Sequence, residues 1–538
     1  MFKYMYTYHP DIWEGYVKNG LIGKNAGVRI PNNIRLPENL RFNEIAKKDG
    51  ELYNIIKQLH GPVIVDRLQG GDFFFEYDFD FDLLDEYKQM LGEDFYGMQF
   101  HEWVTNIRSD MVRIEKDPEC DWTEEGIKNS IQKVFPSQYT FVEAFTAKEY
   151  AQIGKIESAK RMHEVAHKLI DKRIEKHRLV PCDSYALAYK ASLEKGVKTF
   201  MPEVGAQTPD AKFQISYARG MARAYKARFG VFYEPWGGDP FSTCCYERNG
   251  KNEWYVLKKR GDLQHSQQGE NGGSSRSLQK RILHYSYLSG AAFISDEWGG
   301  ANMFTDWDTH ELSPYGLVNK EFMEFVSKYP DIGKKVAPVA LVLPAQMDMV
   351  HNIYADGFCG YPVTGSDGEK LDAIKKIIRS VFSDASEMLG TETKTLINSP
   401  IADCIDVIHE DSSTIGEYKY LIDATCNPAF AKAHNNICEV ENLTSVIDEV
   451  LPCKVTGGLH AMVNEAKGKY YLAIFNNSGV VRTVAEGESV IPESKKIAKV
   501  TLKDGRTLKA LEGSSTVTFE NGEYIIEING GDWFFGEF

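Results

Sequence analysis

The stretch that decides the fold is Thr199-Phe-Met-Pro-Glu203, followed about one helix length later by Gly230-Val-Phe-Tyr-Glu234. Both runs are short and apolar, and each ends on a glutamate. A strand, a helix and a second strand in this order form one unit of a parallel sheet. The same alternation extends across the first 330 residues, with further strand-like runs at residues 27–30, 61–66, 95–103, 179–183 and 291–297.

Repeated βα units over this length favour a closed (β/α)8 (TIM) barrel, with a doubly wound open sheet as the alternative. We therefore predict an α/β protein whose barrel spans residues 1–335. The alternation restarts with strand-like runs at 336–343 and 418–423, which predicts a smaller, flavodoxin-like α/β domain over 336–453. This region carries no GxGxxG turn, so no dinucleotide is assigned to it. Beyond residue 454, hairpin signals at Asp504-Gly505 and Asn521-Gly522 predict a small β-sandwich over 454–538.

The composition limits the partners of the protein. Among its 538 residues, 62 Lys and Arg stand against 77 Asp and Glu, which gives a formal net charge of −15. Such a surface repels a phosphate backbone, so nucleic acid is excluded as a partner. No apolar run is long enough for a membrane span, the first residues do not form a signal peptide, and the nine cysteines are scattered. We expect a cytoplasmic protein with reduced cysteines and no membrane partner.

The predicted strands end on acidic residues. Four of them run directly into Glu102, Glu203, Glu234 or Glu297, and Asp66-Arg67 and Asp183 end two more. Because the carboxyl ends of barrel strands share one mouth, these side chains should converge. Crowded carboxylates repel one another, so one stays protonated as an acid while another acts as a nucleophile or base. Neighbouring tryptophans suit the apolar face of a sugar ring, and this combination is what glycoside hydrolysis requires.

Four short stretches carry a family resemblance: Glu203-Val-Gly, Ser216-Tyr-Ala-Arg-Gly-Met-Ala-Arg223 before Trp236, Tyr287-Leu-Ser-Gly-Ala-Ala before Glu297, and Leu312-Ser-Pro-Tyr-Gly316. Together with the order of the three domains, they resemble family 42 β-galactosidases and related retaining glycosidases of clan A. The resemblance covers most of the chain in architecture but only these stretches in motif.

The resemblance implies a catalytic pair. In the clan, a glutamate ending the seventh strand is the nucleophile, and a glutamate ending the fourth strand, usually after an asparagine, is the acid/base. If residues 27–30 form the first strand, Glu297 takes the seventh place and Glu203 ends the fifth. No candidate follows an asparagine, so the chain departs from the pattern at this point. We expect Glu203 as acid/base and Glu297 as nucleophile, with Glu102 and Glu234 in reserve for either role.

The expected function is that of a β-galactosidase-like, retaining exo-β-glycosidase that cleaves small oligosaccharides without a metal or other cofactor. Clan relatives often assemble through the second domain, so the resemblance also implies a homo-oligomer. The expected substrate-binding residues are Asp66, Arg67, His101, Glu102, Trp103, Asp183, Glu234, Trp236 and Trp298.

Three other functions stay open. A glycoside phosphorylase would need a phosphate site, for which Arg67, Arg276 and the Gly272-Gly-Ser-Ser275 stretch are candidates. A carbohydrate-binding protein without catalysis would use the same fold. A zinc metallopeptidase would use His163-Glu164-Val-Ala-His167, which fits the HExxH pattern. That helix is strongly charged and lacks the third histidine of the extended motif, so we interpret it as an amphipathic surface helix.

Overall fold

The computed structural model describes residues 1–32, 38–66, 79–134, 145–176, 178–205, 210–234, 246–248, 254–256, 269–270, 275–297, 299, 303–347, 357–358, 361–382, 395–483, 487–513 and 515–538. Three predicted site residues, Arg67, Trp236 and Trp298, lie outside these ranges, as do residues 272–274 of the predicted phosphate site.

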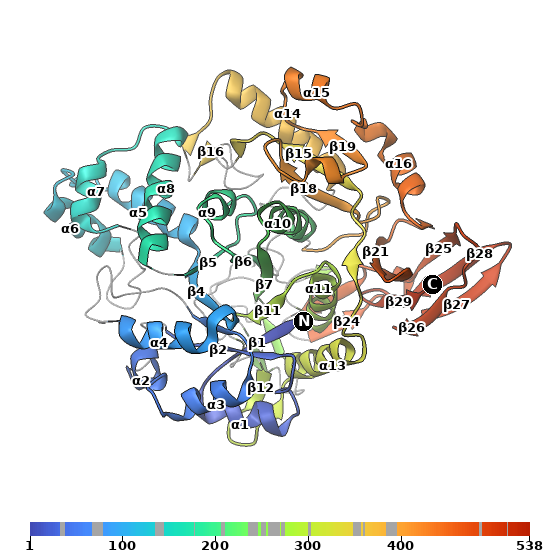
Figure 1. Ribbon diagram of the computed structural model, residues 1–538, viewed down its shortest axis with the longest axis horizontal. Helices are drawn as coiled ribbons and strands as arrows, with labels where there is room; N and C mark the ends of the chain where they lie inside the picture. The colour runs from blue at the N-terminus through green and yellow to red at the C-terminus, as the bar shows by residue number, and fades with distance from the viewer. Residues whose placement is uncertain are drawn as a thin grey trace.

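Eight parallel strands close into a barrel at the centre of the molecule, in the order β1-β11-β7-β6-β5-β4-β3-β2 (Figure 1). The strands are β1 (Lys3–Thr7), β2 (Ala26–Ile30), β3 (Val63–Val65), β4 (Phe95–His101), β5 (Leu179–Asp183), β6 (Thr199–Gly205), β7 (Arg228–Glu234) and β11 (Phe293–Asp296). Helices between them include α1 (Pro10–Lys18), α3 (Glu51–Leu59), α4 (Phe81–Leu91), α5 (Trp103–Lys116), α8 (Ala159–Lys176), α10 (Ala211–Tyr225) and α11 (Arg276–Leu288). The predicted (β/α)8 barrel is confirmed.

The first barrel strand is one that the sequence analysis missed. Strand β1 pairs with β11 through Tyr4 and Ile294, and with β2 through Tyr4 and Ala26, so it closes the barrel. The expected count, which began at residues 27–30, is therefore wrong by one. Barrel strands four to eight are β4, β5, β6, β7 and β11, and they lead to Glu102, Asp183, Glu203, Glu234 and Glu297.

The barrel interior is packed rather than hollow. Alternate residues of the strands point inward and form one apolar cluster of Met5, Ile64, Tyr96, Val180, Cys182, Met201, Phe232 and Phe293. This plug leaves the side chains at the carboxyl ends of the strands as the layer that meets a ligand.

A three-stranded parallel sheet forms the core of the second domain. Its order is β18 (Ile405–His409), β15 (Val339–Leu343), β19 (Tyr420–Asp423), which is the start of the flavodoxin-like order. Barrel helix α10 packs on β18 so closely that a Cβ on Gly220 would lie 2.2 Å from the carbonyl oxygen of Val407. The motif at residues 216–223 therefore joins two domains and does not face the barrel mouth.

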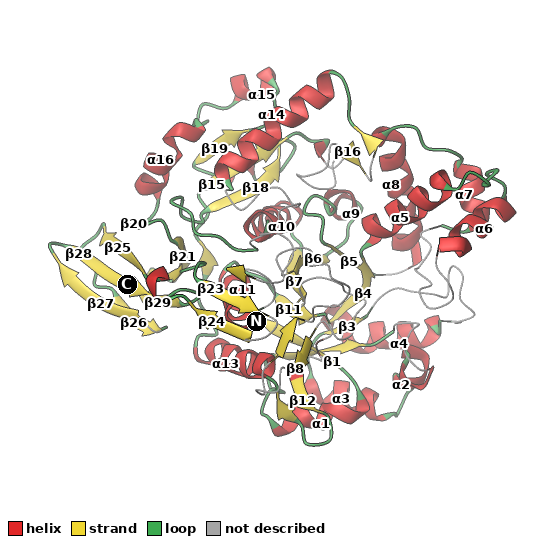
Figure 2. Ribbon diagram, turned by 180° about the vertical axis from the view of Figure 1, so that it is seen from behind, coloured by secondary structure: helices red, strands yellow, loops and turns green. Residues whose placement is uncertain are grey.

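Two antiparallel sheets form most of the C-terminal region that the structure describes (Figure 2), and a smaller sheet pairs β23 (Val480–Thr483) with β24 (Gly487–Val490) and β10 (Gly269–Glu270). One contains β14 (Lys334–Lys335), β21 (His460–Ala466), β22 (Lys469–Phe475), β29 (Trp533–Glu537) and β26 (Lys509–Glu512). The other contains β20 (Cys453–Thr456), β25 (Lys496–Leu502), β28 (Glu523–Ile528) and β27 (Ser515–Glu520). A shared apolar core lies between them. The predicted β-sandwich is confirmed.

Only one of the two hairpin signals forms a hairpin. Asn521 and Gly522 connect the paired strands β27 and β28 and both have positive φ, 52° and 85°, as a type I′ turn requires. Asp504-Gly505 instead lies between β25 and β26, which belong to different sheets. The hairpin expected there is wrong because each strand takes its partner from elsewhere in the chain.

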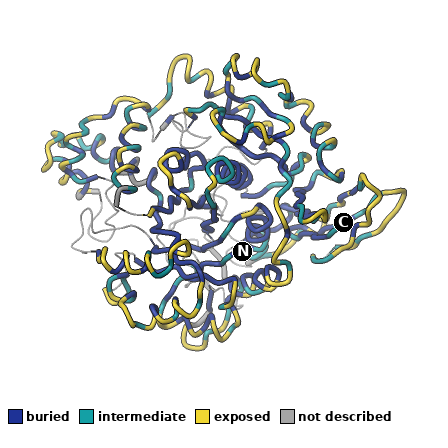
Figure 3. The backbone as a smooth tube through the Cα atoms, viewed as in Figure 1, coloured by how far each residue is buried: buried dark blue, intermediate teal, exposed yellow. Residues whose placement is uncertain are grey.

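Burial follows this architecture: the barrel strands and α10 are buried, while exposed residues gather on the outer helices and the C-terminal edge (Figure 3). Within the described part of the chain, no helix combines the length and apolar character needed to cross a membrane.

Candidate active site

Three of the carboxylates predicted to converge do so at the mouth of the barrel. One oxygen from each of Glu102, Glu203 and Glu234 lies within 4.8 Å of the other two. These residues come from the ends of the fourth, sixth and seventh strands. Backbone hydrogen bonds hold this edge in register: Glu102 N donates to Cys182 O at 2.7 Å, and Glu297 N donates to Tyr233 O at 2.8 Å.

His101 lies at the centre of the acidic cluster. Its Nε2 is 3.6 Å from a carboxylate oxygen of Glu102, 3.6 Å from one of Glu203, and 3.8 Å from one of Glu297. The edge of the imidazole ring also packs against Phe232. Four residues expected to serve the site are therefore brought together around one ring nitrogen.

The acidic side chains differ sharply in access to solvent. The Glu102 side chain is 31% exposed, whereas those of Glu297 and Glu203 are 7% and 0% exposed. Burial raises the pKa of Glu203 well above its usual range, and the negative charges of Glu234, Glu102 and Glu297 raise it further. The environment of Glu203 therefore favours its protonated form, whereas the side chain of Glu102 is accessible to water.

The backbone at Glu102 is left-handed, with φ 46° and ψ 41°, an uncommon conformation for a residue other than glycine. Helix α5 begins at the next residue. The buried Asp183 carboxylate accepts hydrogen bonds from the backbone nitrogens of Val104 at 2.9 Å and Tyr185 at 3.1 Å. Asp183, expected to bind substrate, thus anchors the start of α5 and holds Glu102 in place.

Trp103 does not present its ring to a ligand in this structure. It is 3% exposed, and its ring stacks on Phe100 with an interplanar angle of 15°. As the first residue of α5, it turns into the core beside the barrel and packs there.

A buried arginine that the sequence analysis missed pairs with Asp66. Arg29 donates to Asp66 Oδ1 at 2.6 Å and to the backbone oxygen of Asp296 at 2.8 Å, and its guanidinium lies over the ring of Phe232. Its signal in the sequence is a lone charged residue inside an apolar strand. Asp66 is thereby neutralised, and its link to Arg29 ties the end of β3 to β2 and β11.

Asp296 is a second group that the sequence analysis passed over. Its side chain is buried and accepts a hydrogen bond from the Tyr4 hydroxyl. Burial raises the pKa of Asp296 to about 7, whereas hydrogen bonding to Tyr4 and the charge of Arg29 lower it. Since the unfolded carboxyl titrates near 3.8, the folded state binds the proton more tightly between these values.

This difference predicts a pH-dependent effect of Asp296→Asn. Because the pKa of Asp296 is raised in the folded state, its protonation contributes stability. This contribution is fully present below about pH 4 and is lost as the pH rises toward about 7. The amide stays neutral, so the variant should unfold at a higher temperature than the wild type at pH 8 and show a smaller difference at pH 5. Thermal unfolding at the two pH values measures this. If the variant instead loses unfolding temperature relative to the wild type between pH 5 and pH 8, the raised pKa of Asp296 is contradicted.

Two clusters in the described residues bring possible metal ligands within 4.8 Å of one another: His101, Cys182 and Glu203, and the three glutamates named above. The HExxH pair behaves differently. His163 and His167 lie with their Nε2 atoms 3.0 Å apart on α8, but among the described residues no third ligand joins them in such a cluster. A catalytic zinc site on α8 therefore gains no support.

The predicted phosphate site also finds little support in the part that is described. The backbone nitrogen of Arg276 donates to Glu488 Oε2 at 2.8 Å, and its guanidinium Nε lies 3.5 Å from the same carboxylate. Arg276 thus binds the C-terminal domain at the start of α11.

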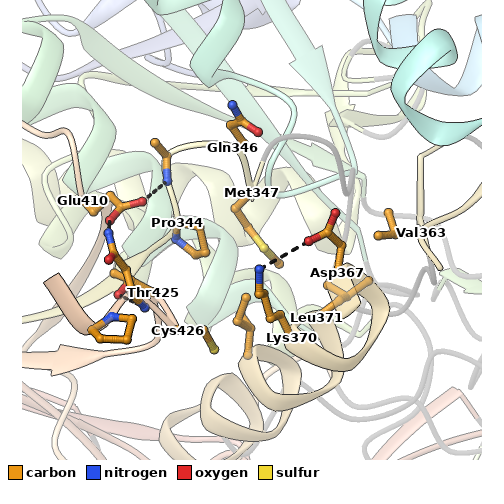
Figure 4. Close-up of a pocket in the computed structure, with 14 residues that line it drawn as sticks. Pro344, Gln346, Met347, Val363, Asp367, Lys370, Leu371, Glu410, Thr425 and Cys426 are labelled. Carbon is orange, nitrogen blue, oxygen red and sulfur yellow. Dashed lines mark hydrogen bonds and ion pairs between the residues drawn. The ribbon is translucent and has the colours of Figure 1, made fainter. Parts of the chain in front are cut away.

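A cavity of about 440 Å³ lies in the second domain, at the carboxyl ends of its strands (Figure 4). Its acidic side chains are already engaged: Glu410 accepts from Ala345 N and Asn427 Nδ2, and Asp367 pairs with Lys370. Among the described residues that line it, no group of carboxylates converges as at the barrel mouth.

Neither a family model nor a curated protein matches the chain. Several solved structures are similar over nearly its whole length. One is the catalytic module of a family 98 glycoside hydrolase from Streptococcus pneumoniae TIGR4, with 12% identity, 98% of this chain and 94% of that chain covered, and a TM-score of 0.45. Another is a GH42 β-galactosidase (a catalytic mutant) from G. stearothermophilus, with 10% identity, coverage of 100% and 98%, and a TM-score of 0.46. A third is α-L-fucosidase isoenzyme 2 from Paenibacillus thiaminolyticus, with 9% identity, coverage of 100% and 99%, and a TM-score of 0.44.

Proposed function

We propose that this protein is a glycoside hydrolase that acts by a two-carboxylate, retaining mechanism. One observation carries the proposal: Glu102, Glu203 and Glu234 bring carboxylate oxygens within 4.8 Å of one another at the carboxyl end of a (β/α)8 barrel. Retaining enzymes hold their two carboxyl groups about 5–5.5 Å apart, whereas inverting enzymes need about 6.5–9.5 Å to admit a water. Carboxylate oxygens within 4.8 Å of one another fit the shorter of these two separations. This favours attack by a carboxylate over attack by water.

Within this cluster, Glu102 is the acid/base and Glu234 the nucleophile. The clan resemblance places these roles on the fourth and seventh strands, and the observed strand count gives those places to Glu102 and Glu234. Solvent access supports the choice, because an acid/base must reach both the leaving group and water, and Glu102 is 31% exposed. His101 stands where the clan usually has asparagine.

The reaction would run in two steps. Glu234 attacks the anomeric carbon while Glu102 gives its proton to the departing oxygen, and a covalent glycosyl-enzyme forms. Glu102 then takes a proton from water, which attacks the anomeric carbon and frees Glu234. Glu203 is fully buried, and because this burial and its neighbours' charges favour its protonated form, it would add less negative charge to the cluster than an ionised carboxylate. Glu297 and Glu203 remain the second candidate pair, on the eighth and sixth strands.

We infer that the substrate is a small β-linked oligosaccharide from which one terminal sugar is removed, as in a β-galactosidase. The sugar hydroxyls would bind the residues that surround the mouth, among them His101, whose Nε2 is 3.6 Å from Glu102 and 3.8 Å from Glu297. Trp236 and Trp298 are the proposed apolar platform, because they follow directly on Glu234-Pro235 and Glu297.

Purified protein should release nitrophenol from one member of a panel of nitrophenyl β-glycosides, with the first-formed sugar keeping the β configuration by NMR. EDTA should leave the rate unchanged. Release that depends on phosphate would identify a phosphorylase instead. Loss of activity in EDTA would point to a metal at the cluster of His101, Cys182 and Glu203. An α-configured first product would contradict retention. No release from the panel or from natural oligosaccharides, with sugar binding intact, would indicate a binding protein.

A further inference from the structure

Gln99 is a fully buried amide inside the barrel, two residues before His101 on β4. Residues two apart on a strand point to the same side, so both side chains lie in the barrel interior. The Gln99 Nε2 is 3.0 Å from His101 Nδ1. An amide nitrogen only donates hydrogen bonds, so His101 Nδ1 must accept, and the proton of the neutral imidazole is on Nε2.

That Nε2–H points toward the carboxylates of Glu102, Glu203 and Glu297. Among the described residues, further ionisable groups of this region include Cys182 and Asp183 on β5, Glu234 on β7, Asp296 on β11, and Arg29 on β2, which is paired with Asp66. Such an acidic environment attracts a second proton to the imidazole. In the observed arrangement, a proton on Nδ1 would meet the N–H of Gln99, so Gln99 opposes the imidazolium form.

We propose that Gln99 is a positioning residue that keeps His101 neutral, with its proton on Nε2. A neutral His101 turns its Nε2–H toward the acidic cluster, at 3.6–3.8 Å from three carboxylates, without cancelling their charge. The repulsion among the carboxylates then remains, and it favours the protonated form that Glu102 needs as the proposed general acid. The tautomer follows from the contacts alone, whereas this consequence for catalysis rests on the proposed function.

Gln99→Glu tests the proposal directly, since a carboxylate in place of the amide would accept a hydrogen bond from a protonated Nδ1. Protein with 15N-labelled histidine, compared with a His101→Gln variant to assign the signals, reports both ring nitrogens. At pH 7 the wild type should show a protonated Nε2 and an unprotonated Nδ1. Gln99→Glu should show both nitrogens protonated. The control is Gln279→Met. It removes a buried amide on α11 that donates to Tyr315 O, and it should leave the His101 signals unchanged.

The kinetic readout is the pH profile of kcat/KM on the glycoside found active. In Gln99→Glu, the imidazolium would stabilise the ionised carboxylates, so the alkaline limb should move down by roughly 1 pH unit. A wild-type His101 that carries a proton on Nδ1 would overturn the proposal, as would an unchanged spectrum in folded Gln99→Glu. If Gln99→Glu does not fold, the wild-type spectrum and that of Gln99→Met test the proposal. Gln99→Met removes the amide N–H, so Nδ1 of His101 should become protonated in this variant. The spectra need no substrate, so the tautomer they report does not depend on whether the protein is a glycosidase.

Discussion

Glu234→Gln is expected to lower kcat by about 10⁴- to 10⁶-fold, because the amide cannot attack the anomeric carbon and the covalent step is lost. The substitution keeps the size of the side chain at the end of β7, so thermal unfolding should change little. Initial rates on the active nitrophenyl glycoside measure the loss. Azide added to Glu234→Ala should restore turnover and give the glycosyl azide with inverted, α configuration, since azide then occupies the place of the nucleophile.

Glu102→Gln should behave differently. Loss of a general acid costs about 10²- to 10⁴-fold, and most for substrates whose leaving groups need a proton. A dinitrophenyl glycoside should therefore form the glycosyl-enzyme at close to the normal rate in this variant. Azide should accelerate its breakdown and give the β-configured azide, because azide attacks without the help of a base.

Two further variants separate the proposed pair from its rival. If Glu297→Ala rather than Glu234→Ala yields the α-azide, Glu297 is the nucleophile and the strand-count argument fails. Glu164→Gln is the matched control: its side chain is 48% exposed on α8, pairs with Arg161, and should leave kcat unaltered. A large loss in this variant would return attention to the HExxH motif.

The barrel could be predicted because each apolar strand and its following helix are local patterns. Strand β1 could not be recognised in the same way, because the strand that pairs with it, β11, is distant in the sequence although it is adjacent in the barrel. The hydroxyls of Tyr4 and Tyr6 bond Asp296 and Asn319, about 300 residues away along the chain. A short Lys-Tyr-Met-Tyr-Thr run becomes a strand only when β11 closes against it.

The convergence of the acidic residues could also be predicted, since every parallel strand ends at the same mouth. The division of roles could not. Asp183 and Glu203 both end apolar strands, yet the carboxylate of Asp183 is held by the backbone of α5 while that of Glu203 faces two other glutamates. Local sequence does not distinguish a carboxylate that anchors a helix from one that enters a reaction cluster. Only the packed neighbours decide this.

The motif at residues 216–223 is a packing motif in the structure. Arg219 and Arg223 of α10 both bind Asp406 on β18, and the hydroxyl of Tyr418 donates to the same carboxylate at 2.9 Å. Asp406 is fully buried and the Arg219 side chain is 6% exposed. Asp406 is therefore the carboxylate shared by both arginines where the barrel meets the second domain; Asp403 lies 3.8 Å from Arg219, and Glu417 lies 3.1 Å from Arg223.

Asp406→Ala is expected to destabilise the protein by about 3–5 kcal/mol, because it removes the nearest counter-charge of the buried Arg219 guanidinium and leaves only Asp403, 3.8 Å away. Asp406→Asn should cost less, since its oxygen can still accept a hydrogen bond. The control is Glu417→Gln, which removes the exposed partner of Arg223 and should cost at most about 1 kcal/mol. Calorimetry and urea unfolding measure the differences.

The form of the transition adds a second test. The lost ion pairs lie between α10 and β18, so Asp406→Ala should weaken the coupling of the two domains as well as lower the overall stability. A single transition in the wild type should then broaden or split, with the second domain unfolding at lower denaturant than the barrel. Enzymatic activity should follow the barrel transition. A uniform shift no larger than that of Glu417→Gln would show that solvent reaches Arg219 and that the buried charge is not what joins the domains.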